Sequence, residues 1–353
     1  MAQPHWQMGL YNQAGNLLAD LSLATDRQLT LQLNQPTVCS FTLPLTSSAA
    51  NLVEPGSTFI KAYRTDLTNT KTLRFYGPVW VDELQTSGGN GIDQIAVTAF
   101  DPMIYLSRRY TTSAFANTQR GTIIKTILDT TNTANDTGIQ TNSALIASSA
   151  TISVDYAEEN PTILDVITQH SEALDGVDVG VSPIEYSAGK IAQLNVYNRR
   201  GIIRQGAVFA YGANTISNCV SVTRTRNADM VANYVIGTAE LGSVTYQDAT
   251  SRNTYKRLET VVSYTQETSS SVLANRTKYY LDTHTDPSMV AEYSITPGPR
   301  APRVFDDFEV GDTVPVVFDQ GVVFQTTQRV YSVSVNIDDT GREAISALQT
   351  RSM

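Results

Sequence analysis

The chain has 353 residues, a net charge of −9 and a sequence pI of about 4.9, and 41% of its residues are hydrophobic. This is a folded composition with room for two or three domains, and it excludes a disordered chain. The acidic balance argues against nucleic-acid binding, which needs clustered Lys and Arg. The nearest approach to a basic patch is Arg199–Arg200, with Arg224 and Arg226 further on. We expect neither a secretory signal nor a membrane span, because the first residues lack the signal pattern and no stretch approaches about 18 apolar residues.

The first hundred residues predict a meander of short strands. Abundant Thr and 17 Tyr favour half-buried β structure. Residues 28–45, QLTLQLNQPTVCSFTLPL, alternate apolar and polar side chains on both sides of a turn at 34–36, which predicts two strands. Further strands are predicted at 57–64, 72–84 and 92–100, with a Gly-rich turn, TSGGNG, at 86–91. We therefore expect a first β-barrel domain over residues 1–105.

Helical spacing replaces strand alternation after Phe100. A helix is predicted at 120–132, where four apolar residues share one face: Ile123, Ile124, Ile127 and Leu128. The Thr/Asn/Ser-rich residues 130–150 are expected to form an exposed connection. A second helix is predicted at 161–175, with Asn160 as its cap, Pro161 in its first turn and Gly176 at its end. Together these elements form a connection and helical segment over 106–178.

Strands resume after this segment. They are predicted at 176–187, 190–198, 206–212, 218–226 and 230–240, and another helix at 269–287 has a Ser cap and a Pro just past its end. We expect a mixed β/α domain at 179–285 that contributes to a second barrel, and the closing strands of that barrel at 286–353. The predicted fold class is mainly β with a few helices, in which two related small β-barrel domains carry helical or mixed insertions.

An internal repeat supports the second barrel. EPGSTFIKAYR (54–64) and EVGDTVPVVFD (309–319) share Glu, Gly and Thr at the same spacing. Each follows a strand, CSFTLPL in the first copy and VAEYSIT in the second, and each precedes two more strands separated by a Gly-containing turn. The preserved order of four strands predicts two related domains rather than a chance match.

Four acidic residues within seven positions raise the question of a metal site or a catalytic pair: Asp306, Asp307, Glu309 and Asp312. Their order lacks the alternating oxygens and closing Glu of an EF-type calcium loop. Neighbouring carboxylates on one loop also cannot be placed with confidence across a sugar-sized cleft. The repeat favours a turn that leads into a strand, in which Gly supplies an unusual backbone conformation. Cation binding by 306–312 stays open.

Other catalytic patterns are missing from the sequence. The histidines His5, His170 and His284 are far apart, and no HExxH, GxSxG or phosphate-binding loop occurs. Cys39 and Cys219 lack CxxC spacing, which favours two buried thiols in a reducing compartment. We therefore assign no catalytic, cofactor-binding or metal-binding residue, no cofactor and no enzymatic activity.

The order of elements resembles that of baseplate or tail-tip hub proteins of tailed bacteriophages, of the type found as minor tail proteins in actinobacterial siphophages. The segments that carry the resemblance are LQLNQPTVCSFTLPL, LVEPGSTFIKAYR, FYGPVWVDEL, AVTAFDPMIYLSRRY, ENPTILDVITQHSEALDGVDV, ADMVANYVIGTAE, FDDFEVGDTVPVVF and RVYSVSVNIDDTGRE. They span nearly the whole chain. The N-terminal MAQPHWQMGLYNQAGNLL and residues 130–150 have no counterpart in this pattern.

The resemblance implies a homotrimer in which six similar barrels surround one axis and match a sixfold tail tube. It implies a location at the virion tail tip after assembly in the host cytoplasm. The implied partners are a distal tail or tail tube protein, a tape measure protein and tail fibre or spike proteins, with DNA only in transit. The subunits would gate the DNA channel during host attachment.

Three alternatives remain open from the sequence. A distal tail protein would form a hexameric ring. A β-rich carbohydrate-active enzyme would lose hydrolysis in Asp307→Asn, and a generic β-rich binding module fits the composition. The expected contact loops are 65–71, 86–91 and 130–150, because loops carry most binding residues.

Overall fold

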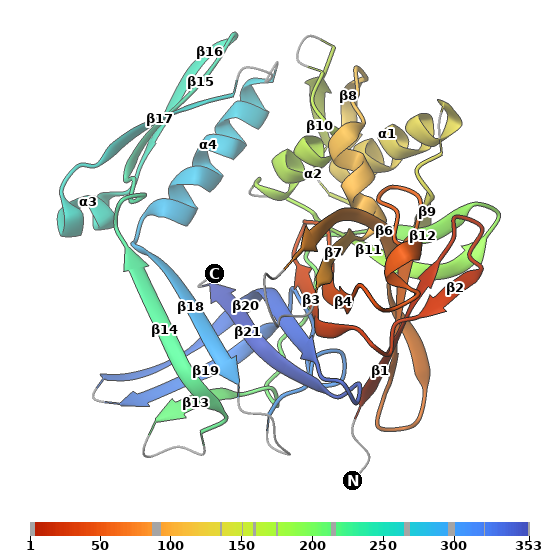
Figure 1. Ribbon diagram of the computed structural model, residues 1–353. Coiled ribbons are helices and arrows are strands. Elements are labelled where there is room, and N and C mark those ends of the chain that lie inside the picture. The colour runs from red at the N-terminus through yellow and green to blue at the C-terminus, as the bar shows by residue number, and fades with distance from the viewer. Residues whose placement is uncertain are drawn as a thin grey trace.

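The protein is described from a computed structural model covering residues 4–86, 93–134, 136–149, 151–157, 160–173, 176–212, 217–264, 269–295, 301–320 and 322–351. It is mostly β with a few helices, as predicted (Figure 1). No helix among these residues has the length and apolar character needed to cross a bilayer.

The N-terminal strands form one antiparallel sheet segment. Its members in spatial order are β3 (Thr25–Gln32), β4 (Val38–Pro44), β7 (Gln94–Phe100), β6 (Lys71–Gln85) and β5 (Phe59–Thr65). We call these strands the first unit. Beyond β5 the sheet continues with β1 (His5–Tyr11) and β2 (Leu17–Asp20). The predicted strands of the first hundred residues are confirmed, and the 86–91 turn lies, apart from Thr86, outside the described residues.

The C-terminal strands repeat this order. The second unit consists of β14 (Cys219–Asn227), β18 (Ser288–Ile295), β21 (Glu343–Arg351), β20 (Val322–Ile337) and β19 (Thr313–Gln320), each antiparallel to its neighbour. A short strand, β13 (Phe209–Gly212), pairs in parallel with β19. Strand β20 also pairs with β3 of the first unit, so the two units share one 13-stranded sheet.

The two units share an irregularity as well as an order. A β-bulge lies between Val79 and Val81 of β6, and another between Val330 and Ser332 of β20. Bulges occur where a strand bends and twists more strongly. The predicted correspondence of four strands is therefore confirmed by the pairing, with β14 and β3 as a fifth matching pair.

The sheets stay open, in contrast to the two predicted barrels. None of the sheets formed by the described residues closes on itself. A barrel needs the first and last strands of a unit to pair with each other. In the first unit β3 pairs instead with β20, and β5 pairs with β1.

Between the units lies a mixed segment. It contains helices α1 (Arg120–Ala134) and α2 (Ile163–Ser171), the pair β8 (Ala114–Gln119) and β10 (Thr151–Asp155), and the sheet β11 (Asp178–Ser187), β12 (Lys190–Tyr197) and β9 (Ile139–Ile146). Both predicted helices are confirmed. The prediction of an exposed connection at 130–150 is wrong, because α1 continues to Ala134 and β9 follows. The cap of α2 is Thr162, which forms a capping box with Asp165, and not Asn160.

A small module lies above β14 and β18 in Figure 1. It contains the sheet β16 (Gly242–Gln247), β15 (Tyr234–Ala239) and β17 (Glu259–Ser263), with α3 (Ala249–Tyr255) and α4 (Ser270–His284). The helix predicted at 269–287 is confirmed as α4. Strands β16 and β17 and helix α3 escaped the sequence analysis, because their short segments lack a clear apolar period.

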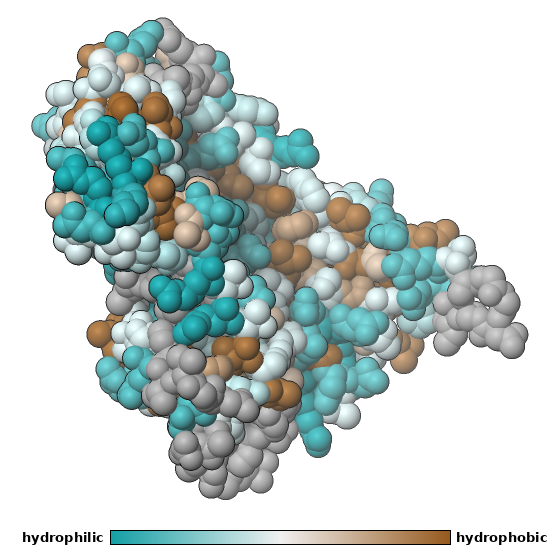
Figure 2. Space-filling model, turned by 90° about the vertical axis from the view of Figure 1, so that its left-hand side faces the viewer, coloured by the Kyte–Doolittle hydropathy of each residue, from teal (hydrophilic) through white to brown (hydrophobic). Residues whose placement is uncertain are grey.

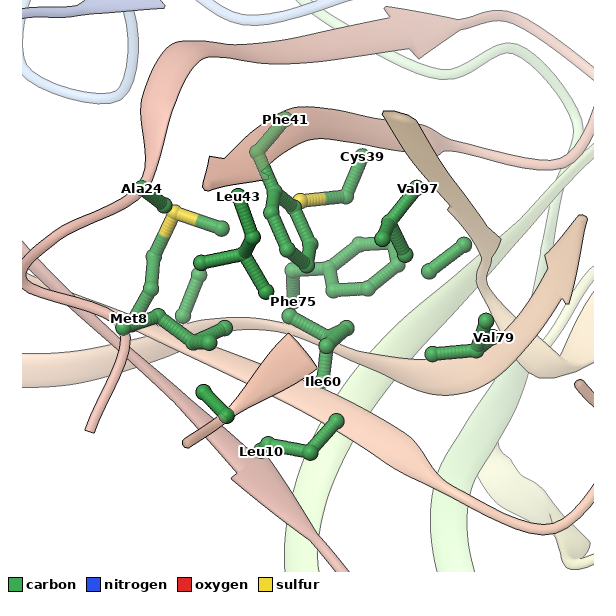
Figure 3. Close-up of a cluster of buried hydrophobic side chains, with 14 of the residues drawn as sticks. Met8, Leu10, Ala24, Cys39, Phe41, Leu43, Ile60, Phe75, Val79 and Val97 are labelled. Carbon is green, nitrogen blue, oxygen red and sulfur yellow. The ribbon is translucent and has the colours of Figure 1, made fainter. Parts of the chain in front are cut away.

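Each unit has its own apolar core. Figure 3 shows that of the first unit, in which Phe41 and Phe75 lie among aliphatic side chains from several strands. The second core includes Phe209, Phe308 and a row of valines from β19 and β20. Two short 3-10 helices lie between strands. Ala50–Leu52 lies between β4 and β5, and Pro102–Arg108 lies between β7 and β8.

Candidate functional site

The two Glu-x-Gly turns have the same job in the two units. Gly56 donates its backbone N–H to the Val79 carbonyl at 2.8 Å, and Gly311 donates to the Val330 carbonyl at 2.9 Å. Both glycines have positive φ, +76° and +98°, which other residues adopt only with strain. Each turn therefore fixes the start of a strand against the bulge of its neighbour. The prediction of a turn that leads into a strand, with Gly in an unusual backbone conformation, is confirmed.

Asp312 accepts hydrogen bonds from backbone and side-chain donors. Its carboxylate is buried, with 2% exposure, and accepts from the Ile202 N–H at 2.7 Å and the Glu309 N–H at 2.9 Å. The Arg204 Nε lies 3.0 Å away. Asp312 thus attaches the strand-like segment 202–204 to the turn of the second unit.

Asp306 takes part in an ion pair that joins the two units. Arg64 of β5 is buried and donates to both Asp306 oxygens, at 2.9 and 2.7 Å, and to both Glu343 oxygens, at 2.8 and 2.7 Å. Burial alone would lower the pKa of Arg64, but the hydrogen bonds to Glu343 and Asp306 raise it overall. Trp6 donates its indole N–H to Glu343 at 2.8 Å, which adds β1 to the same cluster.

The other two acids of the loop have separate partners. Asp307 accepts from the Arg303 N–H at 2.8 Å, and Glu309 lies 3.9 Å from Arg74. The four carboxylates therefore serve a folded turn and its neighbours. In the part of the chain that the structure describes, no three His, Cys, Asp or Glu side chains gather as metal ligands.

The mixed segment is attached to both units by carboxylates. Asp178 of β11 pairs with the buried Arg329 of β20 and accepts from the Arg200 N–H at 2.6 Å. Glu185, at the other end of β11, binds Lys61 at 2.9 Å and the Tyr63 hydroxyl at 2.7 Å. Sequence analysis missed the contacts with Arg329, Lys61 and Tyr63, because these partners are more than a hundred residues away in the sequence.

The histidines and cysteines lie in structural settings. His170 is buried between Arg120, at 3.2 Å, and the Tyr156 hydroxyl, at 3.0 Å. Burial and the nearby arginines lower its pKa to about 3, so it is neutral near pH 7. His284 stacks on Tyr280, and the backbone of His5 forms an isolated antiparallel β-bridge with that of Arg342. Burial raises the pKa of the Cys39 and Cys219 thiols to about 12, which makes them poor nucleophiles.

One face of the large sheet is polar and nearly uncharged where the two units meet. Side chains on this face are Gln28, Thr30, Ser40, Thr98, Ser332, Ser334 and Asn336, and the intervening residues of the same strands point into the cores. Thr30 and Ser334 hydroxyls are 2.9 Å apart, and Gln28 donates to Asn336 at 2.9 Å. The alternation is visible in the sequence, but the shared face depends on the β20–β3 pairing.

The predicted contact loops differ in character. Residues 65–71 form a turn in which Asp66 accepts from the backbone N–H groups of Thr68 and Thr70. Most of 86–91 lies outside the described residues, and 130–150 is largely regular structure.

Figure 2 views the side on which β14 lies and shows hydrophobic side chains interspersed with hydrophilic ones. Arg224 and Arg226, which follow Arg199–Arg200 in the nearest approach to a basic patch, are exposed on β14.

Comparison with known proteins gives the class of fold. No family model matches the chain, and no curated protein sequence matches it. Several solved structures do match the chain. The 43 kDa tail protein of prophage MuSo2 from Shewanella oneidensis has a TM-score of 0.61 at 12% identity, with 98% of each chain covered. A tail protein from Neisseria meningitidis MC58 has a TM-score of 0.60 at 8% identity, covering 99% of this chain and 97% of its own.

A third structure agrees. Prophage tail protein gp18 from Listeria monocytogenes EGD-e has a TM-score of 0.58 at 11% identity, covering 98% of this chain and 94% of its own. The chain therefore has the fold of phage tail proteins over nearly its whole length. At these identities the likeness concerns the fold, so the role of this chain is taken up as a proposal.

Proposed function

We propose that this chain is a structural subunit of a phage tail tip or baseplate hub, with no catalytic step of its own. Three copies would form a ring that joins the sixfold tail tube to a threefold tip. The likeness to phage tail proteins over nearly the full chain supports a tail role.

The main support for a trimer is the duplication of the five-strand unit within one chain. The units share strand order, direction and bulge position. Three chains with two units each provide six similar elements, which is the number that a sixfold partner needs. Head-to-tail contacts that close after a fixed rotation produce such rings.

The uncharged polar face supports a second part of the proposal. We assign the face with Gln28, Thr30, Ser334 and Asn336 to the wall of the DNA channel. Hydroxyl and amide groups without Lys or Arg offer phosphates no fixed counter-charge, so DNA would pass without being held. A shift among subunit interfaces would open this channel during host attachment.

The partners and location follow from the same role. One ring face would bind the distal tail or tail tube protein, and the other would carry fibre or spike proteins. The tape measure protein and DNA would occupy the channel in turn. The ring would be found at the virion tail tip after assembly in the host cytoplasm.

Mass photometry of the full-length protein, followed by electron-microscope imaging of rings, tests the proposal. We expect three chains per particle and six similar lobes around one axis. Six chains per ring would favour the distal tail protein alternative. A particle that stays monomeric up to high micromolar concentration, alone and with the tail tube protein, would contradict both.

A further inference from the structure

The strand pairing between the two units has an equivalent pair of strand edges that do not pair within one chain. Strand β20 of the second unit pairs antiparallel with β3 of the first unit, from Ser332 opposite Gln32 to Ile337 opposite Arg27. The equivalent strands are β6 for β20 and β14 for β3, because they hold the same places in the strand order. Among the described residues, 81–85 of β6 pair only with β7, and β14 pairs only with β18.

These two edges are far apart in the sheet order and are exposed. Six other strands separate β14 from β6 in the large sheet, and Figure 1 labels β14 at the left and β6 right of centre. Val81 is 50% exposed, Leu84 61% and Val220 62%. By contrast, Val335 is fully buried beneath the β20–β3 contact. Val335 corresponds to Leu84 when the bulges of β20 and β6 are aligned. Exposed, flat strand edges with apolar side chains are templates for pairing with another chain.

We propose that β14 of one subunit pairs antiparallel with residues 81–85 of β6 in the next, and so repeats the β20–β3 contact between chains. This inference rests on the proposed ring and identifies its subunit interface. The partner is a second copy of this chain, since that contact already occurs between its two units.

The internal repeat fixes the register. The shared bulge aligns Val330 with Val79, so Ser334 corresponds to Glu83. Pairing through β21 and β7 aligns Ala291 with Cys39, which makes Thr225 the counterpart of Thr30. Thr30 lies opposite Ser334 within the chain. Between chains, Glu83 therefore lies opposite Thr225 of the neighbour.

The charges of the two edges agree with this register. One step along the strands, Asp82 lies opposite Arg226 of the neighbour, and Leu84 lies opposite Arg224. Opposite charges across antiparallel strands attract, and an Arg stem covers an exposed Leu. The β6 edge carries Asp82 and Glu83, and the β14 edge carries the two arginines, so each edge repels a copy of itself and favours a head-to-tail contact.

Disulfide trapping tests the register in the full-length protein. Directly opposed Cβ atoms in antiparallel strands are close enough for a disulfide. Glu83→Cys with Thr225→Cys should give covalent three-chain species on non-reducing gels. Thr30→Cys with Ser334→Cys should close within one chain and serves as the positive control. Glu83→Cys with Ser221→Cys is the matched control, because Ser221 lies four residues, or about 13 Å, along the strand.

Charge exchange tests the same interface without cysteines. Asp82→Arg or Arg226→Asp should weaken self-association at least about tenfold, a difference of about 1.4 kcal/mol. The double exchange should restore it. Glu240→Arg, the same change in an exposed turn away from both edges, should leave association unchanged. The altered side chains are exposed, so each variant should fold, which circular dichroism verifies.

The outcomes separate this interface from the proposed function. Trapping in register, together with rescue by the double exchange, supports the pairing. Trimers that do not trap, or that trap equally through Ser221, overturn the pairing while the hub role stands. Monomers under all conditions, without trapping, overturn both.

Discussion

The two five-strand units differ most in what covers their outer strands. In the first unit β5 is covered by β1, which runs antiparallel and comes from the N-terminus. In the second unit β19 is covered by β13, which runs parallel and comes from the middle of the chain. The strand order is therefore the same in both units, whereas the strand that pairs with the outer edge differs. That additional strand depends on how the rest of the chain is connected to each unit.

The turns show the same division. Both glycines donate to the bulge residue of the neighbouring strand, but the return bond differs by one position. Val79 donates to the Thr58 carbonyl, whereas Val330 donates to the Asp312 carbonyl. The shorter second turn brings Asp312 to segment 202–204, while the equivalent Glu54–Ser57 turn stays exposed. Small changes in a duplicated turn can thus create a binding place for a segment of the same chain.

The largest expected effect concerns the ion pair that joins the two units. Arg64→Met should lower the free energy of unfolding by about 3–5 kcal/mol, because it leaves Asp306 and Glu343 without their buried partner. Urea unfolding should be followed by circular dichroism and by tryptophan fluorescence. Trp6 and Trp80 both lie in strands of the N-terminal part, and Trp6 also contacts Glu343 of the second unit, so fluorescence reports the N-terminal part together with the contact between the units.

Lys71→Met is the matched control, since Lys71 is exposed. Its ammonium group donates to Gln7 and lies over the Tyr63 ring. Its effect should stay within about 0.5 kcal/mol. A loss below about 1 kcal/mol in Arg64→Met would mean that apolar packing alone holds the units together.

Sequence reasoning recovered the strands and their duplication because both depend on local patterns. The alternation in 28–45 and the Glu-x-Gly turns are short-range signals, and so is the apolar face of α1. Helix α4 also begins after Ser269 as predicted, although the Ser269 side chain makes no capping hydrogen bond. It failed where partners are distant. Nothing near Arg64 in sequence announces Asp306, and nothing in β3 announces β20. The barrels were expected because closure within a unit is the simplest way to cover strand edges, whereas this chain pairs edges between units.

The second test compares the two turn glycines directly. Gly56→Ala should cost about 1 kcal/mol, because φ is +76° but a new Cβ meets no heavy atom within 4 Å. Gly311→Ala should cost about 2–3 kcal/mol, because φ is +98° and the new Cβ would lie 2.9 Å from the Arg200 carbonyl oxygen. Thermal unfolding measures both. Gly206→Ala, with open space and no positive φ, should change little. Equal losses of stability in Gly56→Ala and Gly311→Ala would show that the packing of residues 200–204 against the second turn makes no difference to the cost.

The smallest expected effect concerns the contact between the mixed segment and the first unit. Glu185→Gln should cost less than about 1 kcal/mol, because the Glu185 side chain is 61% exposed and its pairing with Lys61 is screened. Burial would raise the pKa of Glu185, but hydrogen bonds from Tyr63 and Lys61 lower it overall below its ordinary value of 4.5. A lowered folded-state pKa gives stability that is present above the ordinary value and lost as the pH falls through the folded value. The difference between Glu185→Gln and the unmodified protein should therefore exist at pH 7 and fade below about pH 4. Unfolding measured at both pH values checks this, and a difference that persists in acid would point to packing at β11 rather than charge.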